Sequence, residues 1–381
     1  MSNFFNYAVS FVKKEAVFCA AFILAAVSCF FVKPCAGYFY YIDWNTLALL
    51  FSLMTIVAAL NSLGIFRFLG NSLCSKITSL RVLCFILIMM CFFFSMILTN
   101  DVALLTFVPF AISVLLEAGA GAFTVTFTVV LQTVAANTGS MLTPIGNPQN
   151  LFLFGKMNCS IFSFMKIIFP FTAVSFLLLA VCMIFIPKGK CAAPKQKFSN
   201  FHQVENSRIY ALRFALYIFL FALSLFSVLG FVPKWISAAV TFAVILFSDR
   251  KIFLKVDYML LFTFTAFFIF TGNIQNMDKV KTFLEGIVRN RECISSVAAS
   301  QVISNVPSAL LLYPFSADLE KLLIGVNVGG LGTLVASLAS LISFKIHSVN
   351  VKKSSGKFFV LFTMVNIAFL ACLLFEYSLL Y

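Results

Sequence analysis

Charged side chains are scarce in this chain. Only 10% of its 381 residues are Asp, Glu, Lys or Arg, whereas a soluble domain carries roughly 25%. It has two tryptophans and two histidines, and its eleven cysteines contain no Cys-x-x-Cys pair. This spacing argues against a metal centre or a disulfide framework, and we interpret the thiols as buried, inert side chains.

Hydrophobic residues are abundant instead. They make up 62% of the sequence, including 50 phenylalanines, and apolar runs of about 20 residues recur along the chain, the length that a membrane-spanning helix needs. Strand-like alternation of apolar and polar residues, which is typical of membrane barrels, is absent. The composition therefore predicts an all-α polytopic membrane protein.

The net charge of +14 is interpreted as a topology signal, and a nucleic-acid partner is rejected. The basic residues lie mostly in short loops between apolar runs, and a cytoplasmic N-terminus would place 17 of the 27 lysines and arginines on the inner side. Lys13 and Lys14 precede an apolar run with no small-residue cleavage site after it, so we expect a retained first span. We predict a location in the plasma (inner) membrane, and the short loops favour a bacterial inner membrane.

A polar segment at 132–150 interrupts the apolar pattern. It holds Gly139, Pro144, Gly146 and Pro148 between two strongly apolar runs. Irregular backbone at membrane depth is tolerated only where it is enclosed by protein or lines a watery cavity. We therefore predict a functional site around this segment.

The interruptions recur in two halves. We predict a first repeat at 1–187, a cytoplasmic linker at 188–208 and a second repeat at 209–381. Each repeat is expected to hold a re-entrant helical hairpin followed by a discontinuous transmembrane helix. The hairpins are expected at about 81–116 and about 292–316, and the broken helices at about 119–155 and about 318–344.

The two halves match at constant offsets. Asn100 and Pro109 correspond to Asn305 and Pro314, at 205 residues (100 to 305, 109 to 314). The broken helices match at 190 residues (Asn137 to 327, 139 to 329, 143 to 333). The basic residues place the polar connector before the first hairpin inside and the connector before the second hairpin outside, which predicts inverted repeats with a site at their interface.

The predicted site binds an anion without any cationic side chain. Helix arms starting after Asp101 and after Val306, and half-helices starting near Pro148 and Leu338, would point four N-termini at the centre. Carbonyls of unwound 137–146 and 327–333 could ligate Na⁺. An anion would then be held by helix dipoles, backbone amides and a co-bound cation.

Asp101 is the one carboxylate within these motifs. An acid inside a membrane is costly and indicates function. Burial favours its neutral form and a nearby Na⁺ its charged form, so a proton or a cation is the expected partner; a purely structural capping role is the alternative. Capping alone likewise stays open for Asn100 and Asn305, and Ser95, Ser300 and Ser308 could be ordinary interhelical hydrogen-bond donors.

These motifs resemble the ion transporter superfamily, which includes the citrate-transporter-like, divalent anion:sodium symporter and arsenite permease families. The segment 143–150, Thr-Pro-Ile-Gly-Asn-Pro-Gln-Asn, is the most specific part of the resemblance. It implies two inverted repeats, a homodimer formed through scaffold helices, and elevator-type movement. Dicarboxylate symporters tend to have Ser-Asn-Thr at both hairpin tips, whereas Asp101 and Val306 stand in the third positions here, which looks more like the arsenite permease branch.

Residues and resemblance together give the candidate site. The expected substrate-binding residues are Asn100, Asp101, Asn305, Ser308, Thr143, Asn147 and Thr333. The expected cation-binding residues, where Na⁺ is the possible metal, are Ser95, Asn100, Asp101, Asn137, Gly146, Ser300, Asn305 and Asn327.

We expect a secondary active transporter of a small anion, a carboxylate or an inorganic oxyanion, that is coupled to Na⁺ or H⁺ and has no cofactor. Arsenite or antimonite efflux and Na⁺/H⁺ antiport are alternatives within the transporter class, and an ion channel is the alternative outside it. An enzyme is not expected, because the interrupted segments contain neither paired aspartates, nor His-Glu metal spacing, nor Ser with His.

Overall fold

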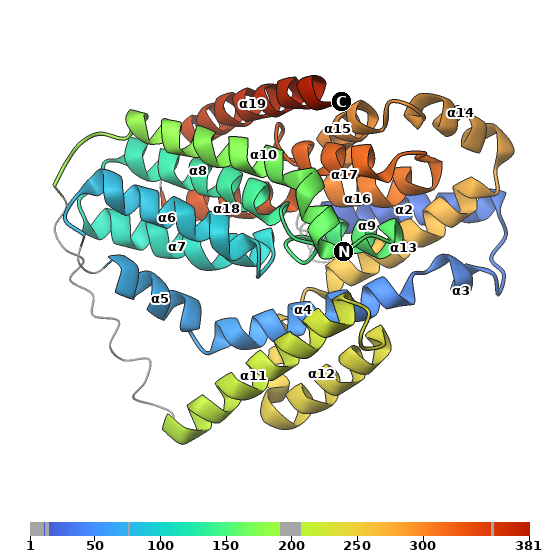
Figure 1. Cartoon of the computed structure of the whole chain (residues 1–381), viewed down its shortest axis with the longest axis horizontal. Helices are drawn as coiled ribbons and strands as arrows, with labels where there is room; N and C mark the ends of the chain where they lie inside the picture. Colours follow the sequence, from blue (N-terminus) through green and yellow to red (C-terminus); the bar gives the residue numbers. More distant parts are fainter. Residues whose placement is uncertain (1–10, 12–14, 75–76, 191–206, 352–353) are drawn as a thin grey trace, which may run out of the picture.

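A computed structural model describes residues 11, 15–74, 77–190, 207–351 and 354–381, and these are almost entirely helical (Figure 1). Within them the extended pairing is one isolated bridge, between Ser79 and Lys190. Six of the described helices are long and apolar enough to cross a membrane, which confirms the prediction of an all-helical, multi-pass membrane chain. They are α4 (Trp44–Ser62), α7 (Asn100–Glu117), α10 (Ile161–Cys182), α11 (Ser207–Val228), α13 (Tyr258–Gln275) and α19 (Ser355–Leu380).

One group of helices carries the interrupted segments, and we call it the site group. Its centre is α8 (Ala122–Ser140), which packs against α6, α7, α10, α18 and α19. The second half of the chain adds α15, which packs on α17, and α16, which contacts both α17 and α9. The members not yet given bounds are α6 (Leu80–Ser95), α9 (Pro148–Met157), α15 (Glu292–Ile303), α16 (Asn305–Leu312), α17 (Leu319–Val328) and α18 (Leu338–Asn350).

A second group, here the frame group, lies along one side of the site group in Figure 1. In it α2 packs along α13, while α11 and α12 pack on α4. Contacts of α13 with α16, of α4 with α9 and of α5 with α6 and α7 join the groups. The remaining elements are α2 (Ala16–Phe31), α3 (Tyr38–Tyr41), α5 (Ile65–Cys74), α12 (Lys234–Asp249), α14 (Asp278–Val288), and the 3-10 turns η1 (Met183–Phe185), η2 (Arg250–Lys255) and η3 (Tyr313–Phe315).

Both predicted hairpins are helical pairs with the same backbone at the tip. Thr99, between α6 and α7, has φ 89° and ψ 148°, and Ser304, between α15 and α16, has φ 76° and ψ 155°. A positive φ at a non-glycine residue costs about 1–3 kcal/mol and persists only where the surroundings impose it. The next residue supplies the constraint in each case, since Asn100 N donates to Gly146 O at 3.1 Å and Asn305 N donates to Ala336 O at 2.9 Å. Each hairpin tip is thus fastened to a helix break.

Both helix breaks begin later in the sequence than predicted. α8 continues to Ser140 and α9 begins at Pro148, while α17 continues to Val328 and α18 begins at Leu338. The predicted half-helix starts at Pro148 and Leu338 are confirmed. The expectation that Asn137 and Asn327 are unwound is wrong, because both lie inside helices, and the hairpin arms begin at Asn100 and Asn305 rather than two residues later.

Gly139 explains why the first break was placed too early. A Cβ added there would lie 2.1 Å from Phe92 O, so the missing side chain permits close contact between α8 and α6. The glycine therefore serves packing within a continuous helix rather than the end of one.

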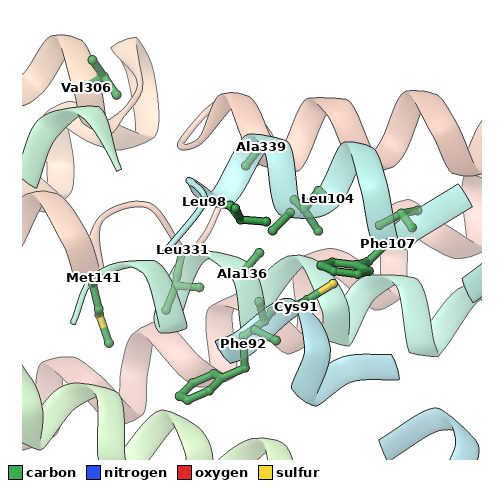
Figure 2. Packing of buried hydrophobic residues seen from close by; sticks show 14 of the residues in the cluster. Cys91, Phe92, Leu98, Leu104, Phe107, Ala136, Met141, Val306, Leu331 and Ala339 are labelled. Atoms are coloured by element: carbon green, nitrogen blue, oxygen red, sulfur yellow. The ribbon is translucent and has the colours of Figure 1, made fainter. Parts of the chain in front are cut away.

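An apolar core lies directly behind the first hairpin tip (Figure 2). There Leu98 and Leu104 of the hairpin gather against Ala136 of α8 and Ala339 of α18, and all four side chains are almost fully buried. In this core α7, α8 and α18 pack against one another, and the close packing holds the tip in place.

Several predictions about topology stay predictions. The inversion of the two repeats and the re-entrant course of the hairpins depend on a membrane, and the predicted linker falls mostly on 191–206, outside the described residues.

Candidate functional site

Buried asparagines join the two broken helices. Asn147 Nδ2 donates to Asn327 Oδ1 at 3.1 Å, and Asn327 Nδ2 donates to Asn150 Oδ1 at 2.7 Å. Asn147 also caps α9, because its Oδ1 accepts the backbone N–H of Asn150 at 2.8 Å. The three side chains are at most 4% exposed, so they form one dry amide contact between the halves of the chain.

Asn137 makes the second connection between the halves. Its Oδ1 accepts from Asn100 Nδ2 and from Ser337 Oγ, each at 3.1 Å. Its own Nδ2 donates to Ser340 Oγ at 3.3 Å and to Gly330 O at 3.4 Å. The first hairpin tip is thereby tied to the second helix break. We call these five asparagines, with Ser337 and Ser340, the amide cluster.

Three helices, α7, α9 and α18, begin at this cluster, and α16 begins next to it at Asn305, whose side chain lies beside Gly330. At the two hairpin tips the asparagine is the first residue of its helix, and its side chain accepts the next backbone N–H: Asn100 Oδ1 accepts from Asp101 N at 3.0 Å, and Asn305 Oδ1 accepts from Val306 N at 2.9 Å. The hydrogen bonds found for the cluster among the described residues involve no Lys or Arg. Positive potential there comes from helix dipoles and amide N–H groups alone.

The structure brings most of the predicted site residues together. Asn100, Asn137, Asn147 and Asn327 belong to the cluster. Gly146 contributes the carbonyl that holds the first tip, Thr143 Oγ1 donates to Met96 O on the same hairpin, and Asn305 lies at the second tip beside Gly330. Their roles in binding stay predictions.

Four hydroxyl groups predicted to belong to the site donate hydrogen bonds to nearby backbone carbonyls instead. Ser95 and Ser300 donate to helix carbonyls, of Phe92 at 2.9 Å and of Ser296 at 2.7 Å. They pack against Gly139 and Gly329, where a Cβ would lie 2.8 Å from each hydroxyl oxygen. Ser308 donates to Ser304 O at 2.9 Å. Thr333 is exposed and donates to Gln301 O at 3.0 Å, away from the cluster.

Two residues of the site were not singled out from the sequence. Asn150 is fully buried and donates to both Met141 O and Thr143 O across the first break; its place at the end of the polar segment was the available signal. Gln301 holds the second break, since its amide donates to Gly329 O at 3.0 Å and to Leu331 O at 2.9 Å.

Among the crevices between the frame group and the site group, two reach the hairpins. The larger, about 430 Å³, runs along α9 and the second hairpin, and we call it the Lys156 crevice. The smaller, about 350 Å³, runs along the first hairpin and α18, and we call it the Asp101 crevice. Residues of the first include Asp43, Phe152, Lys156, Leu310 and Tyr313. Residues of the second include Asp101, Leu105, Asp257, Leu338 and Lys345.

An ion pair crosses the Lys156 crevice. Lys156 Nζ lies 2.7 Å from Asp43 Oδ2, and 5.6–5.7 Å from the ring centres of Phe152 and Tyr313. Burial acts to raise the pKa of Asp43, yet the Lys156 ammonium and the backbone N–H of Thr46 outweigh it and hold the pKa below its ordinary value. Asp43 is therefore a neutralised carboxylate.

Asp101 has no such partner. Its Oδ1 is fully buried without a hydrogen bond, and among the described residues no donor or basic side chain is found on either carboxylate oxygen. Asp257 lines the same crevice. A buried carboxylate with no compensating charge is costly, so this atom invites a cation or a proton.

Comparison with known proteins agrees with this layout. A family model described as citrate transporter matches residues 9–326. An uncharacterized transporter of Methanocaldococcus jannaschii is 29% identical over 336 residues, which cover 88% of this chain and 89% of that protein. Inner membrane protein YbiR of Escherichia coli is 32% identical over 314 residues, 80% of each chain. Silicon efflux transporter LSI3 of Oryza sativa subsp. japonica is 34% identical over 129 residues, which cover 34% of this chain and 26% of that protein.

Proposed function

This chain belongs to the citrate transporter family, within the ion transporter superfamily, and on that premise we propose that it is a secondary active transporter of a small anion. The substrate class is a carboxylate or an inorganic oxyanion, and the driving force is a gradient of Na⁺ or H⁺. The family and its relatives are transporters rather than enzymes.

The amide cluster is the observation that carries the proposal. The N-termini of α7, α9 and α18 begin at one buried group of amides that holds no basic side chain among the described residues, and the N-terminus of α16 lies next to it. Each helix N-terminus stabilises a negative charge by about 0.3–1 kcal/mol, more where water is excluded. Anion binding by dipoles and N–H groups alone leaves the site weakly charged when empty, so the empty carrier can return across the membrane.

Asp101 fits the coupling role. It follows Asn100 at the start of α7, within one residue of the cluster. A second negative charge beside a bound anion is repulsive unless Asp101 is protonated or cation-bound. Anion binding and cation binding therefore favour one another, which is the thermodynamic basis of symport.

Alternating access is supported by the two crevices. One approaches the cluster along the second hairpin and α9, the other along the first hairpin and α18. We propose that the site group moves against the frame group in an elevator-type cycle. The inverted repeats, the re-entrant hairpins, the homodimer and the cytoplasmic N-terminus in a plasma membrane belong to the same proposal.

Efflux of an uncharged oxyacid is the second candidate. The relative from rice is a silicon efflux transporter by name, and amide groups can donate to and accept from neutral hydroxyl groups as well as donate to anions. Arsenite or antimonite efflux falls into this chemistry, and Na⁺/H⁺ antiport would use Asp101 alone. Sensitivity of a deletion strain to arsenite separates the first of these from anion uptake.

The proposal is tested with purified protein in liposomes. Radiolabelled sulfate, phosphate, citrate, succinate and arsenite are offered under an imposed Na⁺ or pH gradient. We expect one anion to accumulate above equilibrium, and the absence of anion movement under every gradient contradicts the proposal. Crosslinking α4 to α9 discriminates a channel, because flux through a channel would survive the crosslink whereas a carrier would stop.

A further inference from the structure

The Asp101 crevice contains a second carboxylate, Asp257, that the proposed substrate site does not use. Asp257 lies at the start of α13 in the frame group and is exposed. Its Oδ1 accepts the backbone N–H of Leu260 at 3.1 Å, which leaves Oδ2 without a partner among the described residues. Asp101 lies deeper, on the first hairpin, with its Oδ1 buried.

The two carboxylates line the same crevice, and their negative charges repel. Lys345 of α18 also lines the crevice, but its side chain is exposed and forms no ion pair within 4 Å among the described residues. Glu15, before α2, adds a further acid to the lining. The crevice is thus acidic, and its deepest acid is uncompensated.

We propose that Asp101 and Asp257 together form the binding site of the coupling cation, a monovalent Na⁺ or a proton, which enters through this crevice. The proposal rests on the proposed function and adds a second ligand and a route to it. Asp257 receives the cation at the mouth, and Asp101 holds it beside the amide cluster.

The physical reason is that a cation offsets the repulsion between the two carboxylates. Two carboxylates that line one crevice, one of them with a buried oxygen, cannot both stay ionised at low cost unless a cation lies between them. Carboxylate oxygens are also the ligands that hard cations prefer. Because one ligand comes from the frame group and the other from the site group, a bound cation favours the arrangement in which this crevice is closed around it.

Asp43 is a matched control for Asp257. It caps α4 with the same backbone angles, φ −81° and ψ 83° in both cases, and its Oδ1 accepts Thr46 N at 3.0 Å. Its charge, however, is already neutralised by Lys156. Asn caps a helix as well as Asp does, so Asp43→Asn and Asp257→Asn remove the same charge and keep the same cap.

The experiment measures binding of the cation itself. Purified wild type, Asp257→Asn and Asp43→Asn are titrated with ²²Na⁺, and proton release is followed with a pH indicator. We expect Asp257→Asn to weaken binding of the coupling ion by roughly tenfold or more, and Asp43→Asn to leave it at the wild-type value. Asp257→Glu restores the charge and is expected to restore binding; Asp257→Ser, also a good cap, serves if the Asn variant fails to fold.

Transport of the anion is measured in parallel, as gradient-driven uptake and as anion exchange without a gradient. Asp257→Asn is expected to lose gradient dependence while exchange continues. Wild-type ion affinity in Asp257→Asn, or equal losses in Asp257→Asn and Asp43→Asn, overturns the cation site. If wild type binds the ion through Asp257 yet moves no anion, the cation site stands and the proposed anion transport is wrong.

Discussion

The Lys156 crevice and the Asp101 crevice each lie between a capped helix of the frame group and one hairpin of the site group. In each, an aspartate caps the helix with the same backbone angles and the same i+3 hydrogen bond. In the first crevice that aspartate is paired with a lysine at 2.7 Å, whereas in the second it shares the crevice with another carboxylate. Similar backbone geometry thus carries opposite electrostatics.

The hairpin tips repeat this pattern. Thr99 and Ser304 share a positive φ, and the asparagine after each donates its backbone N–H to the facing helix break. The next residue is Asp101 in one tip and Val306, 5% exposed, in the other. The two tips share their backbone conformation, but only the first carries a carboxylate. We therefore expect a cation to bind at the first hairpin and not at the second.

The largest effect is expected from the glycines that let the hairpins approach the broken helices. Gly139→Ala places a methyl group 2.1 Å from the Phe92 backbone carbonyl, which cannot yield. Overpacking of this kind costs about 1–3 kcal/mol or more, so we expect little or no folded protein by fluorescence-detected size-exclusion chromatography.

Its counterpart sharpens the comparison of the two halves. In Gly329→Ala the methyl group lies 2.8 Å from a Ser300 side-chain oxygen, which can rotate away, and 2.7 Å from Gly325 O within the same helix; a smaller loss is expected. Gly121→Ala meets nothing within 4 Å and is the control. Equal yields of all three variants would contradict the packing role of Gly139.

The next largest effect is expected from Asp101→Asn. Removing the unpaired carboxylate should abolish gradient-driven uptake, while thermal stability is kept or improved because an uncompensated buried charge is lost. Proteoliposome uptake over a range of pH and Na⁺ checks this. Glu117→Gln, an exposed acid on the same helix, is the control, and unchanged pH and Na⁺ dependence of Asp101→Asn refutes the coupling role.

A smaller effect is expected from the ion pair of the Lys156 crevice. Lys156→Met leaves Asp43 partly buried without its partner and should cost on the order of 1 kcal/mol, a value typical of part-exposed pairs. Lys345→Met removes a lysine that lines the other crevice and has no ion pair among the described residues, so its melting temperature should match that of the wild type. A common shift for both variants would show that the pair contributes nothing specific.

The smallest effect concerns pH. Because the pKa of Asp43 lies below its ordinary value of 3.8, the ion pair stabilises the folded state fully above about pH 4 and is lost as the pH falls further. The stability difference between wild type and Asp43→Asn should therefore be constant from about pH 8 to pH 5 and shrink below pH 4. A difference that already vanishes between pH 7 and pH 5 contradicts the lowered pKa.

Much of the fold could be predicted from the sequence, because long apolar runs and polar interruptions are local signals. Pro148, with no N–H to lose at a helix start, marked the beginning of α9. The C-terminal ends of α8 and α17 were harder to predict from the sequence. Gly139 and Asn137 read as helix breakers, yet tertiary packing keeps them helical.

The residues of the amide cluster were largely predictable from the sequence, but their hydrogen-bond partners were not. Asn100, Asn137, Asn147 and Asn327 stood out as polar residues at membrane depth. Pairing across the halves, such as Asn147 with Asn327, depends on how two segments 180 residues apart come together. The surroundings of Asp257 and the Asp43–Lys156 pair could not be predicted either, because the sequence around a capping aspartate does not show which residue lies opposite it.

The most direct test of the anion site is a binding titration of the transported anion to wild type and to Asn147→Asp. Asp keeps the cap of α9 but cannot donate to Asn327 Oδ1 as Asn147 does, so folding is first checked by size-exclusion chromatography. Its fixed carboxylate occupies the positive potential that the helix N-termini offer to an anion. The account predicts a fall in anion affinity of roughly a hundredfold in calorimetry. Wild-type affinity in a folded Asn147→Asp protein would contradict it.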